Sequence, residues 1–141
     1  MILMAGYSGT PLAKKLGIKD GMRLAALNAP KGYVSWLKAL PPTAKVVSAV
    51  AKNAAAVHLF ATERLKLERG LVRLRTTIDQ DGFVWVSWPK KSSGVATDIT
   101  EDVIREVALP LGFVDVKVCA VNETWSGLKL VIRKGERTSP G

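Results

Sequence analysis

The chain has 141 residues, of which 48% are hydrophobic and 23% charged, and it carries a net charge of +9. This composition is ordinary for a globular protein and excludes a chain that is disordered throughout. One cysteine, Cys119, and one histidine, His58, exclude an internal disulfide, a thiolate metal cluster and a His–His zinc site, so we expect no metal. The longest apolar stretch, 46–61, is interrupted by Lys52 and His58, so we expect no membrane span and, by default, a cytoplasmic protein.

The first half of the chain alternates short apolar segments with turns. We expect a loose arm over 1–10, then a short helix over 11–16, a strand over 22–27, a short helix over 33–40, an edge strand over 45–50 and a buried strand over 55–60. Thr62 is expected to cap a longer helix over 63–77. In that helix Leu65, Leu71, Val72 and Ile78 recur near helical spacing.

The central strand lies in residues 82–91, where the run Phe83–Val86 is typical of a strand buried on both faces. Residues 79–82 (DQDG) are expected to form the turn before it, and Pro89 to end it. After a polar loop over 90–97, Asp98 and Glu101 form a capping-box pattern that predicts a helix over 99–109. A strand over 114–121, a turn over 122–127, a strand over 128–133 and a flexible tail over 135–141 complete the chain.

This alternation of strands and helices predicts an α/β fold in one domain over residues 1–141. We expect a mostly parallel, Rossmann-like three-layer sheet that ends in an antiparallel hairpin. In open sheets of this kind, ligands bind beyond the carboxyl ends of the strands. Four segments should meet at that edge, namely 28–30, 61–62, 87–91 and 122–127.

Two of these segments combine aromatic, basic and hydroxyl side chains. Residues 88–94 (WPKKSSG) would suit an anionic or phosphate-bearing ligand, or else form a solvated loop with Trp88 in the core. Residues 122–127 (NETWSG) would extend this site, or equally form a hairpin turn with Trp125 lying over a helix. The candidate ligand-binding residues are Asn28, Lys31, Thr62, Trp88, Lys90, Lys91, Ser92, Asn122, Thr124, Trp125 and Ser126.

Catalytic residues are harder to find. His58 lies in an apolar run, where a hydrogen-bonded core histidine is favoured over a general base, and Cys119 reads as a packing residue. No serine lies in a G-x-S-x-G elbow, and neither the phosphate-loop pattern nor G-x-G-x-x-G is present. We therefore assign no catalytic residue, and the sequence favours a non-enzyme without deciding the matter.

Several motifs resemble a family of small bacterial proteins catalogued only as a domain of unknown function. They are AGYSGTPL (5–12), LGIK (16–19), WPKK (88–91) and CAVNETWSGL (119–128). The resemblance covers nearly the whole chain. It implies a bacterial, cytoplasmic setting but no activity.

Residues 57–133 are also similar to the carboxyl-terminal half of S-adenosylmethionine-dependent methyltransferases, with a D-G-F-V-W-V-S-W strand and a closing hairpin. The resemblance implies that the last strand inserts between its two predecessors, and that S-adenosylmethionine is a possible cofactor. Two departures count against that cofactor: residues 28–32 replace the family's glycine-rich loop, and no acidic residue follows segment 45–50 to hold the ribose. We interpret the chain as a reduced methyltransferase-like fold.

Three functions remain open. The first is a non-catalytic module that binds a small anionic ligand or a partner at the carboxyl edge of the sheet. The second is a degenerate methyltransferase-like group-transfer enzyme using Trp88, Lys90 and Asn122. The third is association with nucleic acid through basic side chains, although these are scattered along the sequence. The edge strand over 45–50 could also pair across a homodimer.

Overall fold

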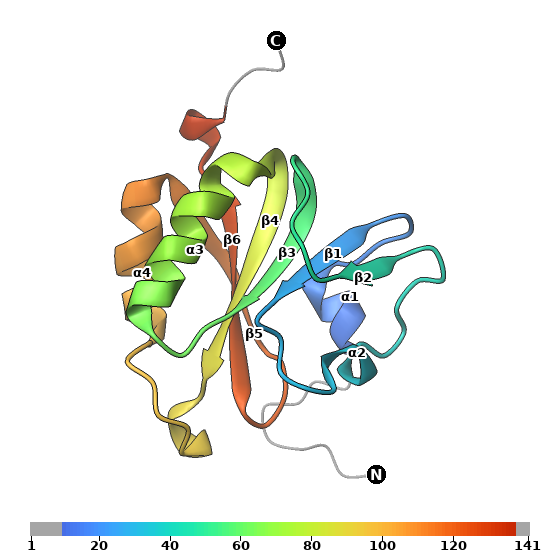
Figure 1. Ribbon diagram of the computed structural model, residues 1–141, viewed down its shortest axis with the longest axis horizontal. Helices are drawn as coiled ribbons and strands as arrows, with labels where there is room; N and C mark the ends of the chain where they lie inside the picture. The colour runs from blue at the N-terminus through green and yellow to red at the C-terminus, as the bar shows by residue number, and fades with distance from the viewer. Residues whose placement is uncertain (1–9, 138–141) are drawn as a thin grey trace.

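The computed structural model describes residues 10–137. Its strands are β1 Arg23–Leu27, β2 Lys45–Val47, β3 Ala54–Phe60, β4 Ile78–Pro89, β5 Phe113–Ala120 and β6 Trp125–Ile132. They form one six-stranded sheet in the order β2-β1-β3-β4-β6-β5 (Figure 1). β1 to β4 are parallel, whereas β6 pairs antiparallel with both β4 and β5. The predicted α/β fold is confirmed, and so is the insertion of the last strand between its two predecessors.

Helices cover the two faces of this sheet (Figure 1). The short helices α1 Leu12–Leu16 and α2 Tyr33–Trp36 lie on one face, and the longer α3 Arg64–Thr77 and α4 Glu101–Ala108 lie on the other. Three short 3-10 turns are η1 Lys91–Ser93, η2 Leu109–Leu111 and η3 Lys134–Glu136. Each face therefore has its own hydrophobic core, as expected for a mostly parallel sheet.

β4 is buried along its second half, as the run of apolar residues predicts, and it ends at Pro89. Trp85 is fully buried, and its indole Nε1 donates a hydrogen bond to the Leu16 carbonyl at 2.9 Å, which ties α1 to the sheet. The turn predicted over 79–82 is wrong, because these residues lie inside β4. The register shifts there between β3 and β4, so the extra polar residues are accommodated as a bulge.

The α3 helix buries only part of the row expected, since Leu71 and Ile78 are buried but Leu65 and Val72 are not. Leu67, Leu71 and Leu74 are buried, whereas Leu65 and Val72 are each 56% exposed. The buried row has the spacing i, i+4, i+7, which places its members on one helix face. Leu65 and Val72 lie on the opposite, solvent-facing side.

The two predicted helix caps are also wrong, since each helix is capped by another residue. The Asp98 carboxylate accepts a hydrogen bond from the Arg64 backbone N–H at 2.7 Å, so it caps α3, where Thr62 was expected. The Thr100 hydroxyl accepts from the Val103 N–H at 3.2 Å and caps α4. The two helix starts are thereby joined, with the Thr62 carbonyl accepting from the Asp98 N–H at 3.3 Å.

Other boundaries moved by a few residues. The helix predicted over 33–40 ends at Trp36, the edge strand over 45–50 ends at Val47, and β6 begins at Trp125, three residues earlier than expected. The arm predicted over 1–10 lies almost wholly outside the described residues. The predicted tail is described only to residue 137, and η3 occupies its beginning.

Candidate functional site

The carboxyl ends of β1 and β3 lie beside the turn that connects β5 to β6. This arrangement follows from the topology, because β6 runs antiparallel to β4 and its first residue pairs with Pro89, the last residue of β4. A cavity of about 350 Å³ lies at this edge, lined by Asn28, Leu59, Phe60, Ala61, Thr62, Lys66 and Trp125. The predicted convergence of loops at the carboxyl edge is therefore present in the structure.

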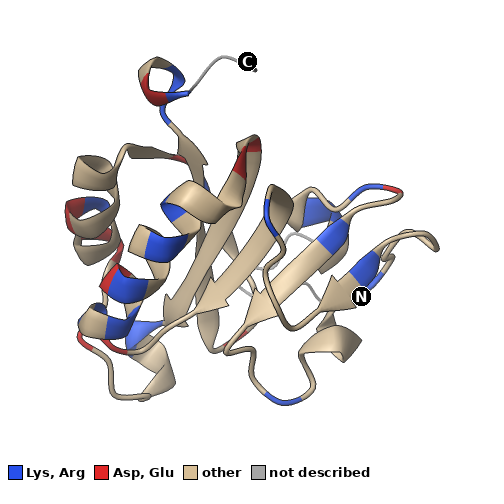
Figure 2. Ribbon diagram, turned by 45° about the horizontal axis from the view of Figure 1, so that its top comes forward, with Lys and Arg blue, Asp and Glu red and all other residues tan. Residues whose placement is uncertain are grey.

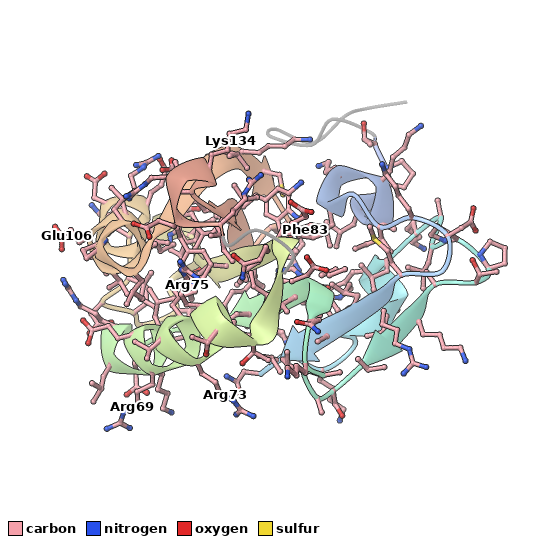
Figure 3. All side chains as sticks on the ribbon, turned by 90° about the horizontal axis from the view of Figure 1, so that it is seen from above. Arg69, Arg73, Arg75, Phe83, Glu106 and Lys134 are labelled. Carbon is pink, nitrogen blue, oxygen red and sulfur yellow. The ribbon has the colours of Figure 1, made fainter. Side chains whose placement is uncertain are left out.

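A second cavity, of about 400 Å³, lies beside the first. Both are lined by Asn28, Leu59 and Lys66, and the second adds Arg73 of α3 and the segment 48–50 that follows β2. Lys66 and Arg73 are seven residues apart, which places them two turns apart on the same side of α3. Figure 3 shows that Arg73 projects from α3 away from α4. We call these two adjoining cavities the edge site.

Asn28 ends β1 with a left-handed backbone conformation, φ +57°. Asparagine tolerates this region better than most residues, because its short polar side chain bonds locally. The left-handed turn directs the chain away from the sheet directly after β1. Asn28 thus lies where the two cavities of the edge site join.

Trp125 is held in place by the hairpin turn. The Asn122 side-chain oxygen accepts hydrogen bonds from the backbone N–H groups of Thr124 and Trp125, at 2.9 and 2.8 Å. The Trp125 ring meets Phe60 edge to face, with ring centroids 5.1 Å apart. The Lys90 N–H donates to the Thr124 carbonyl at 2.8 Å, so the two candidate segments, 88–94 and 122–127, contact each other. Asn122 acts here as a positioning residue for Trp125.

The candidate residues separate into two groups. Asn28, Thr62 and Trp125 line the edge site, whereas Trp88 is only 8% exposed and packs in the core beneath α3 and α4. The remaining candidates line neither cavity of the edge site; they are Lys31, Lys90, Lys91, Ser92, Asn122, Thr124 and Ser126. The sequence analysis missed Lys66 and Arg73, which could be found only by knowing which side of α3 faces β1.

The charges at the edge site are all positive. Lys66 pairs with Glu63 at 2.9 Å, but both side chains are mostly exposed, so the pair adds little stability. The Arg73 guanidinium has no hydrogen bond or ion pair with any of residues 10–137. No carboxylate lines either cavity within that part of the chain. The site therefore favours an anion.

His58 lies close to the edge site, but its side chain is fully buried and lines neither cavity. Its ring is fully buried, with Nδ1 2.7 Å from the Tyr33 hydroxyl and Nε2 2.7 Å from the Ser87 hydroxyl. It also stacks on Phe60, with centroids 4.2 Å apart. Burial lowers the pKa of His58 to about 3, so the ring is neutral at pH 7. The predicted hydrogen-bonded core histidine is confirmed.

Other chemistry is scarce in the described region. Cys119 is half-buried in β5, and burial raises the pKa of its thiol, which reduces its reactivity. Within residues 10–137, no three His, Cys, Asp or Glu side chains lie close enough to hold a metal ion. No helix in the same range has the length and apolar character needed to cross a membrane.

The arrangement of strands and helices is similar to that of known methyltransferases. An S-adenosylmethionine-dependent methyltransferase from Aquifex aeolicus superposes with a TM-score of 0.63 at 13% identity, covering 86% of this chain and 87% of that one. Aeropyrum pernix fibrillarin, solved with natively bound S-adenosylmethionine, gives 0.58 at 11% identity, covering 89% and 70%. The ribosomal protein L11 methylase of Lactobacillus delbrueckii gives 0.54 at 9%, covering 86% and 75%. At these identities the likeness concerns the fold alone.

Comparison of the sequence with protein families identifies the family of this chain, which the shared fold does not. No curated protein matches the chain. A family model matches residues 51–134, a range that holds β3, α3, β4, α4 and both strands of the hairpin. This chain therefore belongs to the family described as "Protein of unknown function (DUF3052)".

Proposed function

We propose that this protein is a non-catalytic binding module that holds a small anionic ligand at the edge site. The observation that carries the proposal is the pair of cations, Lys66 and Arg73, on the side of α3 that faces the carboxyl end of β1. Asn28 adds an amide between them, and Trp125 offers an aromatic wall. Ligand pockets use a few convergent polar groups to orient the ligand, and Asn28, Lys66 and Arg73 supply such groups here.

The residues lining the edge site support binding rather than catalysis. General acid–base chemistry needs a titratable group within hydrogen-bond reach of the ligand. Among residues 10–137, no His, Cys, Asp or Glu lines either cavity, and Lys66, which lines both, forms an ion pair with Glu63 at 2.9 Å. His58, the one imidazole of the chain, is buried behind Phe60 with both nitrogens hydrogen-bonded.

The proposal can be tested by thermal unfolding with ADP as an anionic probe at about 1 mM. A ligand present at about 100 times its Kd stabilises by about 2.7 kcal/mol, which raises the midpoint by several degrees in a domain of this size. We expect Arg73→Gln to abolish the rise. Arg69→Gln is the matched control, because Arg69 lies on the same helix, is exposed and lines no cavity of the edge site. Equal shifts in both variants, or no shift in the wild type, would refute the proposal.

A second candidate is a methyltransferase-like group-transfer enzyme. It is favoured by the fold, which this chain shares with S-adenosylmethionine-dependent methyltransferases. S-adenosylhomocysteine at the same concentration distinguishes the two candidates, because it carries no phosphate and owes less to the charges of Lys66 and Arg73. A rise in midpoint with S-adenosylhomocysteine but not with ADP would favour the enzyme, and a methyl-transfer assay would then follow.

A further inference from the structure

One part of the sheet lacks a covering helix on the α3 side. There α3 and α4 lie over β3 to β6, but no helix within residues 10–137 lies over β1 and β2 (Figure 1). The loop between β2 and β3 crosses this face instead, and a cavity of about 670 Å³ opens between the loop and the strands. Much of the lining is small and apolar, including Ala25, Val47, Ala51 and Ala54. We call this cavity the open-face site.

Two basic residues lie side by side at the start of its strands. Arg23 and Lys45 are direct partners in the parallel ladder, and so are Ala25 and Val47, two residues further along. Ala25 and Val47 belong to the core on the α3 side. Because side chains alternate along a strand, Arg23 and Lys45 project to that same side. Figure 2 shows basic positions at the beginnings of both strands.

Arg23 and Lys45 repel each other, and the effect on the fold is small because both side chains are exposed. Lys52 adds a third cation from the loop, and it lines the same cavity as Arg23. None of these three side chains forms an ion pair with a carboxylate of residues 10–137. Asp20, the one acidic residue lining the cavity, has a carboxylate oxygen that accepts from the Thr43 hydroxyl at 2.9 Å. Asp20 keeps its negative charge, so the two lining cations Arg23 and Lys52 leave the cavity with a net positive charge of one.

We propose that the open-face site binds an amphipathic anion. Arg23 and Lys52, which line the cavity, hold its anionic head group, and its apolar body lies over Ala25 and Val47. Lys45, the strand partner of Arg23, adds positive charge beside the cavity. The volume falls within the range of about 300–1,000 Å³ usual for small-molecule pockets. Among residues 10–137, this cavity and the edge site share only Ser48 and Ala49 in their linings, and they share no charged side chain. The inference therefore stands independently of the proposed function.

Two other occupants fit less well. In a symmetric dimer formed through this face, the same cations would face one another, and two chains of net charge +9 would repel. Nucleic acid would engage the cations, but it would leave the apolar floor of alanine and valine without a matching surface. An amphipathic anion satisfies both the charge and the floor.

The test is a fluorescence titration with 8-anilinonaphthalene-1-sulfonate, an apolar ring system that carries one sulfonate. We expect saturable binding at one site per chain. Dodecanoate and dodecyl phosphate should displace the probe, and the tighter of the two identifies the head group as carboxylate or phosphate. Inorganic phosphate at the same concentration should not displace it, because it lacks the apolar body. Displacement of the probe by inorganic phosphate would overturn the proposal.

Substitutions then locate the site. Arg23→Glu removes a cation that lines the cavity and turns the like-charge pair with Lys45 into a complementary one, so we expect probe binding at least tenfold weaker with an unchanged or higher thermal midpoint. Ala51→Trp should block the cavity without changing its charge. Lys38→Glu is the charge-matched control, since Lys38 is exposed and lies outside the cavity.

Two results would overturn the proposal. One is equal probe affinity in Arg23→Glu and wild type. The other is a wild-type dimer, seen by light scattering, that Arg23→Glu dissociates, because the face would then be a subunit interface. Neither result bears on ADP binding at the edge site, which depends on Arg73, so failure of one proposal is distinguishable from failure of the other.

Discussion

Mild acid should destabilise this protein through His58. The ring is fully buried, and burial lowers its pKa to about 3, whereas a histidine in the unfolded chain titrates near 6.5. Between these two pH values the unfolded chain binds a proton that the folded protein does not. The free energy of unfolding therefore falls as the pH drops from about 6.5 towards 3, by about 1.4 kcal/mol per pH unit. At pH 5.0 the expected loss is about 2 kcal/mol relative to pH 7.5.

Urea unfolding at pH 7.5, 6.5, 5.75 and 5.0 measures this slope. Most carboxylates stay ionised in this window, so their protonation contributes little to the change. His58→Asn removes the titrating group and should flatten the profile, even though losing the hydrogen bonds to Tyr33 and Ser87 lowers its stability at every pH by about 1–3 kcal/mol. Equal slopes in wild type and His58→Asn between pH 6.5 and 5.0 would refute the reasoning.

Three further substitutions test local features, each by the urea midpoint at pH 7.5. Gly82→Ala places a Cβ 2.9 Å from a backbone carbonyl oxygen of β3 and should lower the free energy of unfolding by about 1–3 kcal/mol. In the control Gly135→Ala the new Cβ meets no atom within 4 Å, so the free energy of unfolding should change by less than about 0.5 kcal/mol. Equal losses in the two variants would contradict the bulge. Asp98→Ala removes the cap on the Arg64 N–H and should cost about 1 kcal/mol, with Asp98→Asn closer to wild type; no loss would contradict the cap. Asn122→Ala removes two hydrogen bonds in the turn before β6 and should cost about 1–2 kcal/mol, and a neutral result would contradict its positioning role.

The sheet could be predicted from the sequence because its strands are short apolar runs with sharp ends. Phe83–Val86 and Pro89 placed the buried part of β4 and its end correctly. The order of strands at the hairpin followed from the resemblance to methyltransferases and was confirmed. The bulge at 79–82 could not be predicted, because its four polar and glycine residues have the composition of a turn. Only the pairing of Ile78 with Ala54 of β3 keeps them inside the strand.

The cap errors have a physical cause in tertiary structure. Asp98 precedes Glu101 by three residues, which is a local capping pattern, yet its carboxylate binds the start of a helix 34 residues earlier in the chain. A pattern read along the sequence cannot register such a contact. The same limit applies to α3, where two apolar rows compete and only packing on the sheet selects the row that contains Leu67 and Leu71.

Some residues of the edge site could be predicted from the sequence. Asn28, Thr62 and Trp125 follow or begin strands, so topology alone brings them to one edge. Lys66 and Arg73 come from the middle of a helix, and their place depends on how α3 is rotated about its axis. That rotation is fixed by its buried row of leucines, which the periodicity did not identify uniquely. A wrong prediction of which face of a helix is buried therefore gives a wrong prediction of which of its residues line the site.

The excess positive charge, which the sequence could describe only as scattered, acquires two different meanings in the structure. Arg64 and Arg105 are held in networks with carboxylates, so their charges contribute to the packing of α3, α4 and β5. Arg23 and Lys45 instead lie side by side without such partners, and one substitution would relieve their repulsion. A like-charge pair beside an alanine-lined cavity does not contribute to the stability of the fold and is better explained by an anionic ligand. The same reasoning predicts that the ligand, when bound, stabilises the end of the sheet that no helix covers.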